Sequence, residues 1–317
     1  MAMTSASKLR YPVWIQIFVC NLLWALNPSL AKIIIADIGA EQAAWLKYSS
    51  ALCTYLIFKV VLYFARTEPS NREFFIMPKS PKEFFLIFGI GFCTCFISPV
   101  MQMNGLTNSS ATNNAILVSF EPIFTFLLAW LLIGEDLGAR RVTSLGVAIA
   151  GFFLLSKAQP AIGGSFSWAP LRGDALILVA TAGEAFYLIF SKPLMRTHPA
   201  TQIFGSAMLI GVGLLSVVLL PKVGLPNFGN LSRNSWLAVI WFGPIGTVVP
   251  YLLWIRILEK GMPLSAMSIS LFLQPLIGVL SGIFLLNESL TFSQSIGAAL
   301  IIGAVSLQTS RACPKSV

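Results

Sequence analysis

FEPIFTFLLAWLLIGEDL (residues 120–137) and LQPLIGVLSGIFLLNESL (residues 273–290) are two copies of one pattern in a single chain. Each copy has a polar residue before a proline, a long apolar run, and a glutamate 13 positions after the proline. A proline interrupts the hydrogen-bond ladder of a helix, and a charge inside an apolar run is costly. The recurrence of the proline and the glutamate at the same spacing indicates a repeated helical unit that contains both residues at fixed positions.

The composition assigns this repeated unit to a membrane. Of the 317 residues, 56% are hydrophobic and 10% are charged, whereas soluble domains carry roughly 25% charged residues. The net charge of +9 does not indicate nucleic-acid binding, because the basic residues stand singly or in pairs between apolar segments. Basic loops on the cytoplasmic side of a membrane explain that placement.

The chain is therefore expected to be an all-α integral membrane protein with ten transmembrane helices. Segments apolar and long enough to span a bilayer, including a short fifth one, are at 12–35, 42–64, 84–106, 111–133, 141–157, 173–193, 200–221, 235–258, 264–286 and 292–309. The domain prediction is a first five-helix repeat at 1–157, a linker rich in Gly, Pro and Ser at 158–172, a second repeat at 173–309, and a tail at 310–317.

The basic residues also predict an orientation. With the N-terminus inside, fourteen Lys and Arg fall in the inner loops and four in the outer loops. The remaining three, Lys32, Lys47 and Lys59, lie within helices. This asymmetry predicts a multi-pass protein of the plasma (inner) membrane with both termini in the cytoplasm. The apolar stretch after Lys8 and Arg10 is long enough to span, so it is interpreted as an uncleaved first helix.

Five helices in each unit imply that the two units are inverted relative to each other, because five is odd. Two fainter similarities support the pairing: WALNPSLAK (24–32) and EAFYLIFSK (184–192) both end on a lysine, and Pro99 and Pro250 lie in the third and eighth helices. Inverted repeats are typical of secondary transporters, whose substrate site lies near the midplane between the halves. A duplication without a transport role is the alternative.

Polar residues follow one face of several expected helices at intervals of three, four and seven positions. We expect them to surround a substrate-binding cavity lined by Asn21, Trp24, Gln102, Asn114, Glu121, Glu184, Tyr187, Tyr251, Trp254 and Gln274. The aromatic rings would accept an apolar or cationic group, and the amides would bind a polar one. Interhelical hydrogen bonding without a substrate is the alternative for the uncharged members. The fifth and tenth helices lack such a face and are expected at the periphery.

Among the charges inside the expected helices, Glu121, Glu184, Lys32 and Lys47 require their own explanation. A low-dielectric site favours the protonated form of a carboxylate, so Glu121 or Glu184 is expected to carry a coupling proton. Lys32 and Lys47 are expected to form charge pairs or a gate. Two static ion pairs that only fix helix packing, or lysines that extend to the membrane surface, are the alternatives.

No cofactor or metal is expected. The five cysteines have neither zinc nor redox spacing, and His198 is the single histidine, so a histidine-based metal site or a Ser-His-Asp triad is not indicated. The protein is therefore not expected to be an enzyme.

These motifs resemble EamA-type members of the drug/metabolite transporter superfamily. WALNPSLAK resembles the family's first-helix pattern, with Ala25 where glycine is usual, and LKYSSAL resembles the second-helix pattern, with Lys47 where arginine is usual. EPIFTFLLAWLLIGEDLGARRVTSLGVAIAGFFLL (121–155) resembles the signature that ends each half. The second copy has Gln274 and Asn287 in place of Glu and Gly.

The resemblance implies a carrier that works by alternating access on a small metabolite, such as an amino acid or a related amphipathic compound, often exported with proton coupling. Its expected partners are that small molecule, the lipid bilayer and protons, with no nucleic acid, and it would be a monomer or a homodimer. An uncoupled facilitator or exchanger for a cationic or nucleotide-like metabolite is the nearest alternative. An integral membrane enzyme is a distant one.

Overall fold

The computed structural model describes residues 10–65, 73–134, 138–157, 168–259, 270–271 and 273–309, and all regular elements within these ranges are helical. Eight described helical stretches are long and apolar enough to cross a membrane: Val13–Ile38, Ala40–Phe64, Pro81–Asn108, Ala111–Leu132, Ala139–Ser156, Ala169–Leu194, Ala200–Val223 and Arg233–Ile257. Two shorter apolar helices, Leu273–Leu286 and Phe292–Leu307, follow them. Part of the expected ninth span, 264–286, lies outside the described residues.

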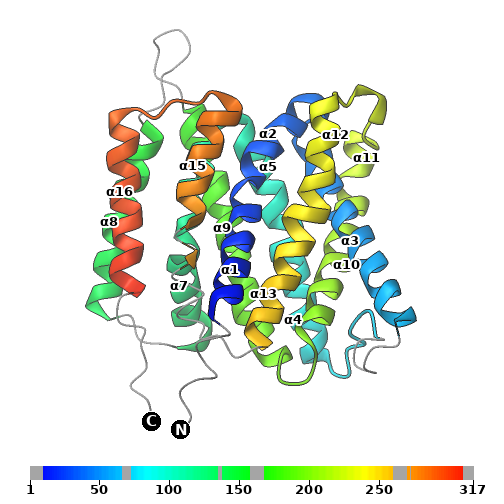
Figure 1. Ribbon diagram of the computed structural model, residues 1–317. Coiled ribbons are helices and arrows are strands. Elements are labelled where there is room, and N and C mark those ends of the chain that lie inside the picture. Colours follow the sequence, from blue (N-terminus) through cyan, green and yellow to red (C-terminus); the bar gives the residue numbers. More distant parts are fainter. Residues whose placement is uncertain are drawn as a thin grey trace.

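The helices run side by side, up and down along one axis (Figure 1). We call the end where α2 stops and α9 begins the distal end, and the opposite end the proximal end. The α-helices are α1 (Arg10–Ala25), α2 (Asn27–Ile38), α3 (Ala40–Phe64), α4 (Pro81–Phe92), α5 (Ser98–Asn108), α6 (Ala111–Leu117), α7 (Glu121–Ile133), α8 (Ala139–Lys157), α9 (Ala169–Leu194), α10 (Ala200–Val218), α11 (Leu220–Val223), α12 (Arg233–Ile240), α13 (Val249–Glu259), α15 (Leu273–Leu286) and α16 (Phe292–Thr309).

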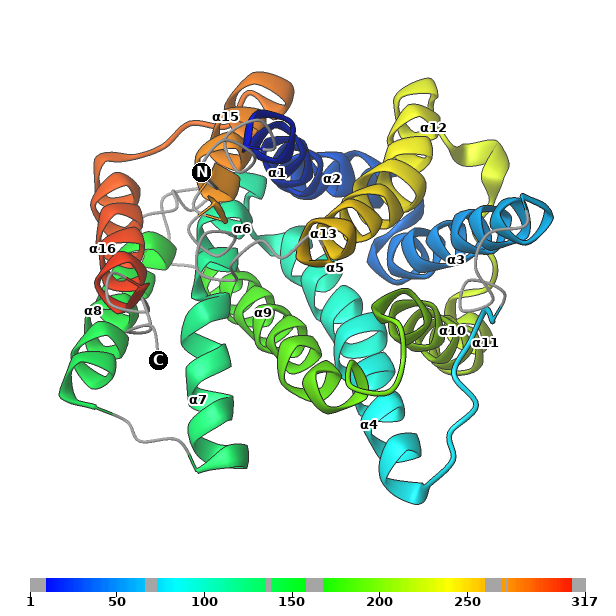
Figure 2. The same cartoon turned by 60° about the horizontal axis from the view of Figure 1, so that its bottom comes forward.

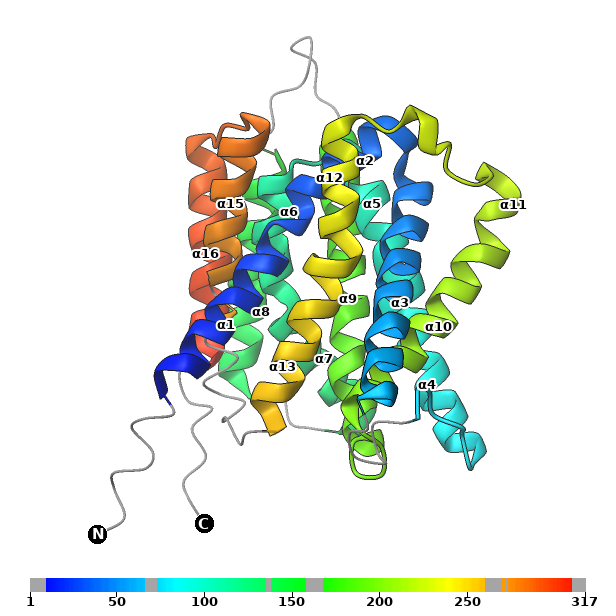
Figure 3. The ribbon, with the colours of Figure 1, turned by 45° about the vertical axis from the view of Figure 1, so that its right-hand side comes forward.

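Prolines explain two breaks in these helices. The first span divides at Leu26, because Pro28 stands at the start of α2 and cannot donate a backbone hydrogen bond. Figure 3 shows α1 running obliquely into α2. The fourth span changes to a 3-10 turn, η3 (Val118–Phe120), directly before Glu121 and Pro122. The proline of the opening motif therefore begins a new helix at Glu121.

Two π-helical segments lie at matching places in the third and eighth spans. These are η2 (Cys93–Ile97), which precedes Pro99, and η5 (Trp241–Val248), which precedes Pro250. Pro250 has no N–H to donate to the carbonyl of Gly246 one turn earlier. The side-chain amide of Asn27 donates to that carbonyl instead, at 2.8 Å. This hydrogen bond thus connects the break in the first span with the π segment of the eighth span.

Helices α8 and α16 pack on each other at one edge of the bundle (Figure 2). Two glycines allow this close approach: a Cβ at Gly151 would lie 2.8 Å from the carbonyl oxygen of Gly297, and a Cβ at Gly297 would lie 2.7 Å from that of Gly151. The pair meets the rest of the bundle through an apolar cluster that includes Phe152, Leu155 and Ile301. The expected peripheral position of the fifth and tenth helices is seen in this arrangement.

The outward faces of the bundle are apolar, with large exposed side chains such as Phe64, Val217 and Phe284. In a soluble protein such a surface would be an exception. Together with the eight apolar stretches, it supports a multi-pass membrane protein.

Candidate functional site

Lys47 and Glu184 form the charged centre of the bundle. Lys47, on α3, is buried at 8% exposure, and it interacts electrostatically with Glu184 of α9. Its Nζ also lies 5.1 Å from the ring centroid of Phe242 and 5.4 Å from that of Tyr48. Lys47 therefore does not extend to the membrane surface, and the interpretation of Lys47 as a snorkelling lysine is wrong.

Glu184 is held by neutral donors as well as by Lys47. The hydroxyl of Ser98, directly after the π segment η2, donates to its Oε1 at 2.8 Å, and Tyr251 of α13 is a second hydrogen-bond partner. The carboxylate thus joins α3, α5, α9 and α13. An ionised carboxylate with a cation and two hydroxyl donors is a well-stabilised group for a low-dielectric site.

Glu121 is in a different position. It begins α7 after the 3-10 turn and is partly buried, and its carboxylate makes no hydrogen bond or ion pair within the part of the chain that the structure describes. The charged group that interacts most strongly with the Glu121 carboxylate is Glu184. Lys47, Glu184 and Glu121 therefore form a cluster in which two carboxylates face one described cation.

Four of the expected aromatic residues meet beside this cluster. The ring centroid of Trp24, on α1, lies 5.5 Å from that of Tyr251 and 5.4 Å from that of Trp254. Tyr187, one turn after Glu184, lies 5.8 Å from Tyr251. The hydroxyl of Tyr187 is buried and has no hydrogen-bond partner among the described residues. Aromatic faces next to a carboxylate can bind a cationic group.

The expected amide residues form two separate pairs. Gln274 of α15 donates to Asn21 of α1 at 3.2 Å, and Asn21 donates in turn to Ser270 at 3.1 Å. Gln102 of α5 donates to the Oδ1 of Asn114 on α6 at 3.3 Å. The Nδ2 of Asn114 is buried and without a partner in the described part of the chain. None of the ten expected lining residues lies in the exposed class.

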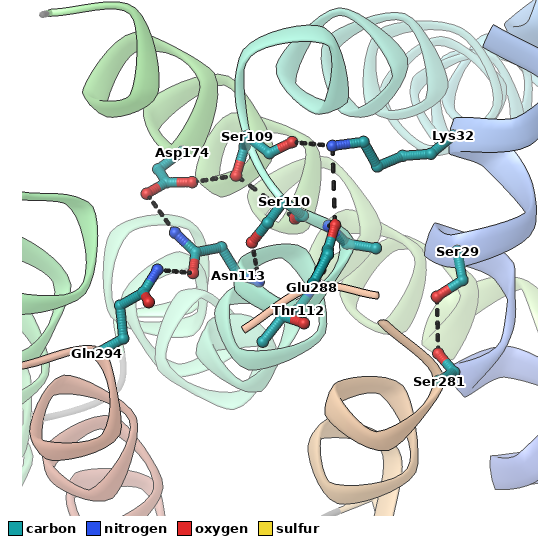
Figure 4. Close-up of polar contacts among 11 residues, drawn as sticks. Ser29, Lys32, Ser109, Ser110, Thr112, Asn113, Asp174, Ser281, Glu288 and Gln294 are labelled. Carbon is teal, nitrogen blue, oxygen red and sulfur yellow. Dashed lines mark hydrogen bonds and ion pairs between the residues drawn. The ribbon is translucent and has the colours of Figure 1, made fainter. Parts of the chain in front are cut away.

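Lys32 lies apart from the central cluster, at the distal end. Its Nζ donates to the backbone carbonyl of Ser109 at 2.6 Å and lies 3.8 Å from the Oε1 of Glu288 (Figure 4). The sequence pattern identified Glu288 only as the repeat partner of Glu135. It did not identify Glu288 as the partner of Lys32, because Glu288 follows the last residue of its helix.

Asp174 is a buried carboxylate that the sequence analysis missed. It has no exposed surface, accepts a hydrogen bond from the hydroxyl of Ser109, and accepts another from the amide of Asn113 at 3.0 Å. Its position at the junction of the expected linker and the sixth helix concealed it.

No group of three or more His, Cys, Asp or Glu side chains that could hold a metal ion occurs in the ranges that the structure describes.

The chain is similar to several transporters and to several solved structures. An uncharacterized transporter of Archaeoglobus fulgidus is 27% identical over 225 residues, 70% of this chain and 75% of that protein. A WAT1-related chloroplastic protein of Arabidopsis thaliana is 27% identical over 73% of this chain, and the match spans 56% of that protein. A crystal structure matches 97% of this chain and 100% of its own with a TM-score of 0.63 at 17% identity, which shows the shared fold alone.

A family profile, the EamA-like transporter family, matches residues 13–157 and again residues 171–310. The two matches fall on the two halves that the repeated motif marks, and they cover most of the chain. The apolar helices and the relatives agree with this assignment. The chain therefore belongs to the EamA-like transporter family and is a membrane transporter of the drug/metabolite type.

Proposed function

We propose that the protein is a secondary active transporter that exports a small metabolite, an amino acid or a related amphipathic compound, by alternating access with proton coupling. The observation that carries the proposal is the cluster of Lys47, Glu184 and Glu121. With both carboxylates ionised, its described charges sum to one negative charge in a low-dielectric site. One proton, or one cationic group of a substrate, would neutralise it.

Alternating access needs two units that move against each other, and we propose ten spans in two inverted halves, α1 to α8 and α9 to α16. The matched π segments and prolines of the third and eighth spans support this symmetry. So do the helix contacts: α5 packs on α9 as α1 packs on α13, and α4 packs on α10 as α3 packs on η5. By the distribution of basic residues, the proximal end would face the cytoplasm, with the protein a monomer or a homodimer.

Within this mechanism the residues take separate roles. Glu121 would carry the coupling proton because it lacks a described counter-charge, whereas Glu184 would share its charge with Lys47. Trp24, Tyr187, Tyr251 and Trp254 would bind the apolar or cationic part of the substrate. The unpartnered amide of Asn114 and hydroxyl of Tyr187 are donors that a polar substrate group would satisfy.

The test begins with a thermal-shift screen of the purified protein against the amino acids, nucleotides and aromatic amines, since a ligand raises the stability of the state it binds. The strongest hit is then followed in proteoliposomes with and without a pH gradient. Glu121→Gln is expected to abolish the effect of the gradient. Glu41→Gln, which removes a carboxylate from the first turn of α3, is the matched control.

Two results would change the proposal. If neither Glu121→Gln nor Glu184→Gln alters gradient-driven transport, these carboxylates do not couple protons. If the unsubstituted protein transports equally well without a gradient, it is a facilitator or exchanger, and the excess negative charge then favours a cationic substrate over a nucleotide-like one.

A further inference from the structure

Several polar contacts join the two halves at the distal end (Figure 4). Among them are Ser29 with Ser281 at 2.7 Å, Lys32 with Glu288 at 3.8 Å, Ser109 with Asp174, and Gln294 with Asn113 at 3.2 Å. In each contact one residue belongs to the first half and the other to the second half. The distal end is therefore closed across the boundary between halves.

These contacts differ in how easily water can replace them. Asp174 and Asn113 have no exposed surface and Gln294 has 4%, so their bonds lie in the dry interior. The side chains of Lys32 and Glu288 are 31% and 15% exposed. Separating this pair returns two charges to water at low cost, whereas separating the buried set strands polar groups. The ion pair is the contact suited to break and re-form.

Lys32 and Glu288 also bind the backbone where the connection between α5 and α6 leads into α6. Lys32 donates to the carbonyl of Ser109, and the Glu288 carboxylate accepts from the backbone N–H groups of Ala111 at 2.9 Å and Thr112 at 2.8 Å. One side chain comes from each half. The connection is thus held on both sides by opposite charges that attract each other.

Next to the ion pair, helix α15 presents two glycines, Gly278 and Gly282, to helix α6. On α15, a Cβ at Gly282 would lie 2.4 Å from the Thr112 hydroxyl oxygen and 2.8 Å from the Glu288 Oε2, and one at Gly278 would lie 2.4 Å from the Ala115 Cβ. The absence of side chains at both positions lets α15 lie flush on α6. Small residues at such an interface let two helices approach closely.

We propose that Lys32 and Glu288 are positioning residues of the transport cycle: their ion pair holds the distal ends of the two halves closed in one state and separates in the other. This inference rests on the alternating access proposed above. It makes no use of the proton or of Glu121, so its test can fail while proton coupling stands.

The test follows Ser281, which is 6% exposed and faces Ser29 in the closed end. Ser281→Cys is made in a protein whose five native cysteines are replaced by alanine, and its labelling by a membrane-impermeant maleimide is timed in proteoliposomes. Glu288→Gln and Lys32→Gln are expected to raise the labelling rate at least about fivefold, the lower range of coupling between sites. Glu288→Asp and Lys32→Arg keep the charges and should give rates nearer the starting value.

Glu41→Gln is the matched control, because it removes a carboxylate at the same end of the bundle. Equal labelling rates for Glu288→Gln and Glu41→Gln would overturn the proposal and leave the pair as static packing. Thermal unfolding of each variant shows whether it is folded. Where Glu288→Gln loses its fold, Lys32→Gln decides alone, because it leaves both hydrogen bonds of Glu288 to α6 in place.

A second measurement is independent of labelling. Ser29→Cys with Ser281→Cys, in the same alanine background, is expected to form a disulfide on mild oxidation, and Lys32→Gln should lower the yield. An unchanged yield would show that the ion pair does not hold this end closed.

Discussion

Replacing Lys47 by methionine removes the described cation of the central cluster, including its contact over the Phe242 ring, and keeps an unbranched apolar side chain in its place. Lys47 and Glu184 interact electrostatically in the interior, and removing one of two such charges leaves the other uncompensated. For a direct buried ion pair that loss is about 3–5 kcal/mol. Glu184 keeps its hydrogen bonds from Ser98, at 2.8 Å, and from Tyr251. We therefore expect the lower value, about 3 kcal/mol, which corresponds to a fall in Tm of about 6–12 °C.

The assay is thermal unfolding of the purified protein in detergent, followed by tryptophan fluorescence. The double variant Lys47→Met with Glu184→Gln no longer carries the stranded charge, so it should recover most of the lost stability.

Equal losses of stability in Lys47→Met and in the double variant would refute this reasoning. That result would mean that Glu184 does not depend on Lys47 and that the cluster is not one electrostatic unit.

Two further predictions concern the backbone. Asn27→Ala removes the donor to the carbonyl of Gly246 and should cost about 1–3 kcal/mol, seen as a lower Tm. Asn27→Ala is also made in a Gly246→Ala background, where the added Cβ would lie 2.1 Å from the Asn27 Oδ1. If the two losses of stability do not add, both changes act on the same contact between Asn27 and Gly246. Gly243→Ala should cost about 1–3 kcal/mol, because its Cβ would lie 2.7 Å from the carbonyl oxygen of Lys47. Gly213→Ala, inside α10 with open space at its Cβ, should instead keep or slightly raise the Tm, because alanine favours a helix more than glycine does.

The sequence was sufficient to predict the helices and the family to which the chain belongs. Apolar length and turn chemistry predicted nearly every described span, including the short fifth one, which the structure extends to Ala139–Lys157. The sixth helix begins at Ala169 instead of 173, because Pro170 suits the first turn of a helix and adds residues to it. Such boundaries depend on local capping, which hydropathy does not describe.

The polar contacts were harder to predict. Helical spacing groups residues on one helix, and it placed Trp24, Tyr251 and Trp254 on faces that do meet. It says nothing of which helices are neighbours, so the pairing of Lys32 with Glu288 required the tertiary structure. Both Glu288 and Asp174 lie at the ends of their spans, where a search for charges inside apolar runs does not look.

The π segments η2 and η5 have a consequence for how the chain tolerates length changes. A π turn holds one more residue than an α turn, so each segment rotates the helix that follows it by about 100° relative to an unbroken α-helix. Deleting one residue from η5 (Trp241–Val248) would let the segment relax to an α-helix and would turn Tyr251 and Trp254 away from Trp24. Under the proposed function, a relative shorter by one residue there would present another side of its eighth helix to the substrate, and its selectivity would differ through rotation of that helix alone.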